Sequence, residues 1–325
     1  MAERMLDEQL DKYLADAHSI EVQALAQMRD APKIAGDPDI AAAFGEHLTE
    51  TERHERLVRE RLEARGGTPS RFKKVVMEAG GKGFVLFARS QPDTPGKLVA
   101  HALSYEALEQ ASYELLRRVA ERAGDEATAA MASEILRDEE AMAQRLEGLF
   151  DKAVDASLRE KSSNDLREQL VKYLADAHAI EQQAIQLLGR GPKLAGDPEL
   201  AHLYEEHLGE SKEHSRIWER QLEALGGKPN KLKDAAMRLG ALNWGGFFQA
   251  HPDTPGKLAA FAYAFEHLEI GGFEELKRVA QRAGEQETAA AAERILAEEY
   301  AAATKLRANF DRACEASLEA AGVAR

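Results

Sequence analysis

The sequence has few of the features that mark secreted and membrane proteins. It contains one cysteine, Cys314, so no disulfide can form within the chain, and such usage is typical of a reducing compartment. No run approaches the roughly 18 consecutive apolar residues that a membrane-spanning helix needs. The first residues, MAERMLDEQL, are charged and include no apolar signal-peptide segment. We therefore expect a cytoplasmic protein with no membrane partner.

Clusters of basic residues are also missing. The chain has 57 acidic and 43 basic residues and a formal net charge of -14, and the basic residues are dispersed along it. This distribution argues against a nucleic-acid partner, whereas an acidic surface favours solubility and cations. The chain contains no nucleophile elbow, phosphate-binding loop or dinucleotide fingerprint. Cys314 has no histidine near it in the sequence, so we interpret it as a packing residue.

A tandem duplication organises the chain. The segment KYLADAHSIE at Lys12 recurs as KYLADAHAIE at Lys172, 160 positions later, and the same offset relates the two copies of AGDP and of PDTPGKL. The charged and small polar segment LREKSSNDL between the copies is typical of an exposed linker. With 325 residues, 44% of them hydrophobic, the chain can form two domains, which we place at residues 1–160 and 161–325.

The apolar residues of each half recur with the period of an α-helix, and no stretch alternates as a strand does. In the first half, long helices are predicted at about residues 6–28, 38–65, 96–122 and 127–157. The glycine-interrupted segment FKKVVMEAGGKGFVLFAR is expected to form a short extra helix in the crossover between the second and third long helices. This is the plan of a ferritin-like four-helix bundle. The predicted fold is therefore all-α, with two tandem bundles of this kind.

Each long helix carries ionisable residues in the stripe that should face the core. At about 100° per residue, His47, Glu50 and His54 fall within one narrow arc beside the apolar Phe44. The other long helices carry inward glutamates, and the second half repeats the pattern. The predicted ligands are Glu21, Glu50, His54, Glu106, Glu109 and Glu139 in the first half, and Glu181, Glu210, His214, Glu266, Glu269 and Glu299 in the second.

Several carboxylates in one low-dielectric seam repel one another, and each costs several kcal/mol to desolvate. Lysine and arginine are scarce on these stripes, so either protonation of some carboxyl groups or bound cations must compensate. Carboxylates with imidazoles at helical spacing are the ligands expected for iron, manganese or zinc, whereas magnesium and calcium favour oxygen-only sites. Two metal ions per bundle, about 3.5 to 4 Å apart, would balance roughly four negative charges. Iron is the expected metal, with manganese or zinc as alternatives.

Four further histidines leave alternatives open. His18, His47, His178 and His207 lie on or near the same stripes. Each can hydrogen bond to a ligand or simply lie at the boundary of the core. A single inward glutamate is likewise more often bonded to a protein partner than to a metal, so the argument for metal rests on the coincidence of all four helices.

The motifs HLTETERHERL, YEALEQASYELL and ILRDEEAMAQRL resemble the YciE/YciF-like stress-protein family within the ferritin-like superfamily. The second half is closer, because FEHLEIGGFEEL and ILAEEYAAATKL are similar to the EHxEI and LxEE signatures of that family. The resemblance covers nearly the whole chain, once per half. It implies a dimerising four-helix ferritin-like fold with a dinuclear metal site, but no particular reaction.

The chain departs from the usual di-iron pattern of that superfamily, which has one glutamate on each of two helices and Glu-x-x-His on each of the other two. Thr51 stands three residues before His54, and the nearest preceding carboxylate is Glu50. Met142 stands three residues after Glu139, where the second histidine would be expected. The second half departs in the same way. We therefore predict a carboxylate-rich site with one histidine per bundle.

Three functions fit these observations. The first is a redox metalloprotein of stress protection, which would make the chain a di-metal oxidoreductase of the ferroxidase or catalase-like type. The second is metal sequestration without turnover, and the third is a structural or interaction module whose metal site has degenerated. Metal ions are the expected partners, and the fused halves should form an intrachain pseudo-dimer of bundles, with a homo-oligomer as a further option. An array of short helical repeats fits poorly because the period is 160 residues.

Overall fold

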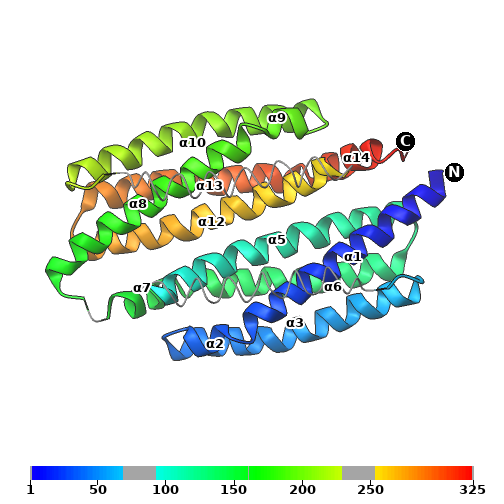
Figure 1. The fold of residues 1–325 in the computed structure, drawn as a ribbon, viewed down its shortest axis with the longest axis horizontal. Helices are drawn as coiled ribbons and strands as arrows, with labels where there is room; N and C mark the ends of the chain where they lie inside the picture. The colour runs from blue at the N-terminus through cyan, green and yellow to red at the C-terminus, as the bar shows by residue number, and fades with distance from the viewer. Residues whose placement is uncertain (1, 69–92, 160, 229–252, 324–325) are drawn as a thin grey trace. The chain divides into compact units, whose positions relative to one another are not determined.

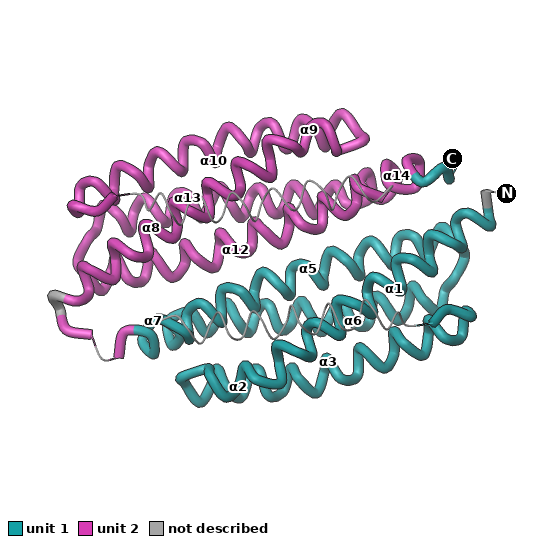
Figure 2. The backbone as a smooth tube through the Cα atoms, in the orientation of Figure 1, with its two compact units in different colours: residues 1–157, 321–325 teal, residues 158–320 magenta. Residues whose placement is uncertain are grey.

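The computed structural model describes residues 2–68, 93–159, 161–228 and 253–323 (Figure 1). All regular structure in these ranges is helical. The chain divides into two compact units, residues 1–157 with 321–325 and residues 158–320 (Figure 2). The predicted all-α fold of tandem helical bundles is confirmed. The segments expected to hold the extra crossover helices lie in 69–92 and 229–252, outside the described residues.

In the first unit the long helices pack as a four-membered ring. α5 contacts both α1 and α6, and α3 contacts the same two helices, so each long helix has two neighbours. α7 follows α6 in the chain, and α2 is a single turn between α1 and α3. The described helices are α1 (Ala2–Met28), α2 (Ala31–Ile34), α3 (Pro38–Ala64), α5 (Thr94–Arg122), α6 (Glu126–Glu147) and α7 (Phe150–Leu158).

The second unit repeats this arrangement. α12 contacts α8 and α13, and α10 contacts the same two helices, while α14 packs against α12. The described helices are α8 (Ser163–Leu188), α9 (Gly191–Leu194), α10 (Pro198–Ala224), α12 (Thr254–Ala283), α13 (Gln286–Ala308) and α14 (Phe310–Ala320). None of the helices described in either unit has the length and apolar character needed to cross a membrane.

Local capping sets the ends of α3. The side chain of Asp37 accepts hydrogen bonds from the backbone N–H groups of Asp39, at 2.9 Å, and Ile40, at 3.3 Å, while Pro38 begins the helix. Beyond the last turn, Gly66 has a φ of 83°, a left-handed conformation that glycine adopts without strain. The predicted start and stop of this helix are confirmed.

The fourth helix of each unit is not continuous, contrary to the prediction of one helix over residues 127–157. A turn at Gly148 and Leu149 separates α6 from α7, and Asn309 separates α13 from α14. Glycine is a poor helix former. The side chain of Asn309 donates a hydrogen bond to the backbone carbonyl of Lys305 at 2.8 Å, a local bond that competes with the helical ladder.

α8 begins inside the segment predicted to be the linker. Ser162 and Asp165 form a capping box, in which the carboxylate of Asp165 accepts the Ser162 backbone N–H at 2.9 Å and the Ser162 hydroxyl accepts the Asp165 backbone N–H at 3.4 Å. The helix therefore starts at Ser163, and the non-helical connection is shorter than the sequence indicates.

The bundle interior combines apolar layers with ionisable groups. Leu14, Phe44, Leu116 and Ile135 are fully buried on the four long helices of the first unit. Ionisable residues follow on the same stripes, such as Glu139 one turn after Ile135. The apolar layers thereby shield the ionisable groups from water.

Candidate metal centre

Two groups of metal-ligand type lie in the interior of the first bundle. Within each group, one donor atom per residue lies within 4.8 Å of every other. The six residues involved are at most 1% exposed. One group is His47, Glu106, Glu109 and Glu139, and the other is Glu21, His54 and Glu139. Glu139 belongs to both groups, so its carboxylate lies where it can connect them.

The second bundle holds the equivalent pair of groups. They are His207, Glu266, Glu269 and Glu299, and Glu181, His214 and Glu299. Glu299 is the shared residue, 160 positions after Glu139. All six residues are again buried, His207 being the most exposed at 6%. The two halves have therefore kept the same arrangement of donors.

All four long helices contribute to each centre. α1 supplies Glu21, α5 supplies two glutamates three residues apart, and α6 supplies Glu139. α3 supplies both histidines, His47 and His54, whose separation of seven residues is about two turns and brings them to one face.

The inward-facing ring nitrogens lie close to carboxylate oxygens of other helices. In the first bundle, Nδ1 of His54 is 2.8 Å from Oε1 of Glu139, and Nε2 of His47 is 3.3 Å from Oε1 of Glu106 and 3.6 Å from Oε2 of Glu139. In the second bundle the same ring nitrogens face inward, with Nδ1 of His214 2.9 Å from Glu299 and Nε2 of His207 2.8 Å from Glu266.

The outer nitrogen of each imidazole contacts a second carboxylate. Nδ1 of His47 lies 3.0 Å from Glu50, and Nε2 of His54 lies 3.1 Å from Asp138. The equivalent distances in the second bundle are 2.9 Å from His207 to Glu210 and 2.7 Å from His214 to Glu298. A carboxylate that accepts the outer N–H fixes the tautomer and orientation of the ring, so that the inner nitrogen presents its lone pair to a metal ion.

Many of the converging atoms have no hydrogen-bond partner among the described residues. In the first bundle they are Oε2 of Glu21, Nε2 of His47, Nδ1 of His54, both oxygens of Glu106, both oxygens of Glu109 and Oε2 of Glu139. An unsatisfied buried polar group costs about 1–3 kcal/mol, and more if it is charged. Carboxylate oxygens and imidazole nitrogens that converge without hydrogen-bond donors between them are suited to a divalent transition metal. The residues present therefore fit such an ion.

Comparison with known families agrees with the repeated architecture. A family model described as a domain of unknown function, DUF892, matches the sequence twice, over residues 5–159 and 165–319. The chain belongs to the DUF892 family. This family is of the ferritin-like type, and the double match confirms the tandem repeat. No solved structure matches the chain.

Burial shifts the pKa values of the metal-ligand residues in both DUF892 repeats when no metal is bound. It raises the pKa of Glu21 to about 8 and that of Glu139 to about 7, and it raises the pKa of Glu109 well above its usual range. Burial acts to lower the pKa of His54, but the adjoining Glu139 and Glu21 raise it to about 9. In the second repeat the pKa of Glu181 rises to about 8 by burial. The metal-free centre therefore holds protons at neutral pH, in positions that a cation would otherwise take.

The predicted ligands fall into two classes in the structure. Ten of them lie in the metal-ligand groups: Glu21, His54, Glu106, Glu109 and Glu139, with Glu181, His214, Glu266, Glu269 and Glu299. Glu50 and Glu210 do not. Their side chains are 35% and 32% exposed and contact the outer nitrogens of His47 and His207.

His47 and His207, which the sequence left open, join the groups. Each bundle thus brings two imidazoles together, where the sequence predicted one histidine ligand per bundle. The signal that could have identified His47 is its spacing of seven residues from His54. His18 lies outside the groups, where its Nε2 is 3.0 Å from Oε1 of Glu55.

The two repeats differ beside the first-helix glutamate. The hydroxyl of Tyr113 on α5 donates a hydrogen bond to Oε1 of Glu21. The equivalent residue in the second repeat is Phe273, which packs on Trp218 with ring centroids 5.2 Å apart. Glu181 therefore lacks the phenol contact that Glu21 receives.

Proposed function

We propose that each DUF892 repeat binds two metal ions and that the protein is a redox metalloprotein of stress protection, of the ferroxidase or peroxide-consuming type. The observation that carries this proposal is the shared, buried carboxylate of Glu139, which adjoins two imidazoles and has an oxygen with no hydrogen-bond partner among the described residues. Glu299 repeats the arrangement in the second bundle.

The donor set favours iron or manganese over zinc. His47, Glu106 and Glu109 would hold one ion and Glu21 and His54 the other, with Glu139 between them. Four carboxylates and two imidazoles are the ligand count of di-iron and di-manganese carboxylate bundles, although here both histidines come from one helix. Structural zinc sites usually have four ligands and favour cysteine and histidine.

A pair of iron ions would supply two electrons, one from each Fe²⁺, which together with two protons convert one hydrogen peroxide molecule to two water molecules. The role of the chain is to hold the donors. Glu50 and Asp138 orient the imidazoles of His47 and His54, and the buried carboxyl group of Glu109 retains a proton that cation binding displaces. The nearly complete burial of the ligands excludes bulk water.

Further properties belong to the same proposal. The resemblance to the YciE/YciF-like family supports a stress-related role, and the single cysteine is typical of a reducing compartment such as the cytoplasm. The two repeats, with domains at residues 1–160 and 161–325, would form an intrachain pseudo-dimer that replaces the dimer implied by that resemblance.

Elemental analysis of the full-length protein after mild purification tests the proposal. We expect about four iron or manganese ions per chain and consumption of oxygen or peroxide when Fe²⁺ is supplied. The variant with Glu139→Gln and Glu299→Gln should lose both properties, whereas Glu126→Gln, an exposed change on α6, should retain them. Metal without turnover would favour sequestration. A protein that binds no metal would favour the structural or interaction module.

A further inference from the structure

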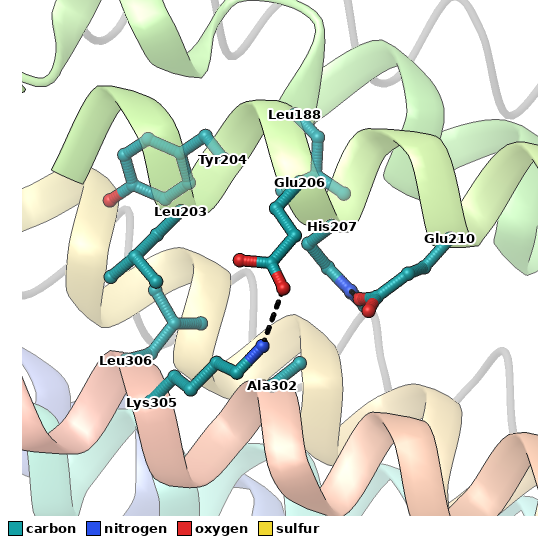
Figure 3. Close-up of a pocket in the computed structure, with 9 residues that line it drawn as sticks. All are labelled: Leu188, Leu203, Tyr204, Glu206, His207, Glu210, Ala302, Lys305 and Leu306. Atoms are coloured by element: carbon teal, nitrogen blue, oxygen red, sulfur yellow. Dashed lines mark hydrogen bonds and ion pairs between the residues drawn. The ribbon is translucent and has the colours of Figure 1, made fainter. Parts of the chain in front are cut away.

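A depression on the second bundle leads to the metal-ligand group of His207 (Figure 3). Its volume is about 10 Å³, enough for about one water molecule, and its lining includes Glu206, His207, Glu210, Ala302 and Lys305. Figure 3 shows Lys305 reaching from α13 to Glu206 on α10, while the side chains of His207 and Glu210 meet beside them. All lining residues belong to the second unit.

One of the residues that line this opening differs between the repeats in a way that affects its size. Ala302 stands on α13 where α6 has Met142, and the methionine side chain is fully buried. Both residues lie three positions after the shared glutamate, one turn along the same helix face. Alanine lacks the outer three heavy atoms of methionine. In agreement, the His207 side chain is 7% exposed and the His47 side chain 1%.

The exposed fraction of the polar lining side chains decreases from the mouth of the depression toward the metal-ligand group. The side chain of Glu206 is 43% exposed, that of Glu210 is 32% exposed and that of His207 is 7% exposed. Beyond them lies Glu266, 2.8 Å from Nε2 of His207 and 2% exposed. This decrease in exposure therefore ends at Nε2 of His207 and the carboxylate of Glu266, which both belong to the metal-ligand group.

We propose that this depression is the route by which a divalent cation enters the centre of the second repeat, and that Met142 closes the equivalent route in the first. Glu210 is a positioning residue that attracts the cation toward His207, and Lys305 holds Glu206 at the mouth through an ion pair of 2.8 Å. The proposal rests on the metal binding proposed above and adds a difference between the two repeats: the second repeat loads faster.

The rate of cation uptake by the metal-free full-length protein tests this route. Co²⁺ is the probe, and the depletion of free Co²⁺ is followed with a fluorescent chelator in a stopped-flow instrument. Glu139→Gln removes binding by the first repeat, so that only uptake by the second is observed. Glu299→Gln removes binding by the second repeat, so that only uptake by the first is observed. We expect the second repeat to load about tenfold faster than the first. Adding Ala302→Met should slow the second repeat to the rate of the first, and adding Met142→Ala should speed up the first, with the amount bound at equilibrium unchanged.

Ala301→Met is the matched control, because it adds the same side chain at an exposed neighbouring position of α13 and should leave the rate unchanged. Met142→Ala removes atoms whereas Ala302→Met adds them, so the test stands if the larger residue prevents folding.

Equal uptake rates for the two repeats and for both variants, with Co²⁺ still bound at equilibrium, would overturn the route but leave the metal centres intact. If the unsubstituted protein binds no Co²⁺ at equilibrium, the metal centres themselves are refuted. If Ala302→Met slows the reaction with peroxide but not the uptake of Co²⁺, the depression admits a small neutral oxidant and the cation route is wrong.

Discussion

Nδ1 of His54 on α3 lies 2.8 Å from Oε1 of Glu139 on α6, and both side chains are buried to at least 99%. The other oxygen of the same carboxylate lies 3.6 Å from Nε2 of His47. One glutamate thus connects two imidazoles of a single helix across the bundle. In the metal-free protein this contact depends on protons, whereas in the metal-bound protein the same atoms would become ligands, and the two states therefore respond differently to pH.

Removal of metal should lower the melting temperature, and by more at about pH 8 than at about pH 5. Burial raises the pKa of Glu21 from 4.5 to about 8 and that of Glu139 from 4.5 to about 7. Between the ordinary pKa of 4.5 and the raised pKa of about 8, the native metal-free protein binds more protons than the unfolded chain. Its free energy of unfolding therefore falls as the pH rises through this interval. Cation binding strengthens over the same interval because protons compete less, and it adds about 2.7 kcal/mol at a hundredfold excess over Kd. Calorimetry with and without chelator measures the difference, and equal melting temperatures at pH 8 would contradict it.

The variant with Glu109→Gln and Glu139→Gln should lose tight metal binding in the first bundle yet remain at least as stable without metal. Glutamine keeps the shape of glutamate and removes two buried groups that repel each other when ionised. Metal content per chain should fall by half, and urea unfolding of the metal-free protein should show no loss of stability. The control with Glu60→Gln and Glu126→Gln makes the same chemical change at exposed positions. Unfolding of the first variant would show that these carboxylates are structural.

Glu50→Gln should weaken metal binding by the first bundle roughly 10- to 100-fold without abolishing it, the usual effect of losing a carboxylate that orients a ligating histidine. The reason is that Oε2 of Glu50 lies 3.0 Å from the outer nitrogen of His47. Competitive titration against a chelator, in a chain that also carries Glu299→Gln, isolates this bundle. Glu52→Gln, exposed on α3, serves as the control. Complete loss of binding would instead make Glu50 a direct ligand.

Tyr113→Phe should destabilise the metal-free first bundle by about 1–3 kcal/mol, because it leaves a buried oxygen of Glu21 without its hydrogen-bond donor. The same change makes the first repeat resemble the second, where Phe273 stands at this position. Bound metal should reduce the loss, since Glu21 would then be a ligand. Denaturant unfolding with and without metal provides the measurement, and an equal loss in both states would place Glu21 outside the metal site.

Features that depend on neighbouring residues could be predicted from the sequence. The helical period gave the all-α fold, the offset of 160 gave the two repeats, and Asp37 with Gly66 predicted the ends of α3. Carboxylates in the apolar stripes indicated an unusual interior, because a stripe on a helix is set by spacing alone. These properties require only the geometry of a single helix and the chemistry of its termini.

Which side chains lie innermost is decided only when the four helices pack together. His47 and Glu50 lie near one edge of the same stripe, three residues apart, and the sequence favoured Glu50 as the ligand. In the structure His47 lies 3.3 Å from Glu106 on α5, whereas Glu50 stays partly exposed and bonds to the outer side of that imidazole. The rotation of α3 about its axis is decided by packing against α1 and α6, which periodicity does not specify. The chain by itself thus determined that acidic and imidazole groups would enter the core, and only the tertiary packing decided which of them meet.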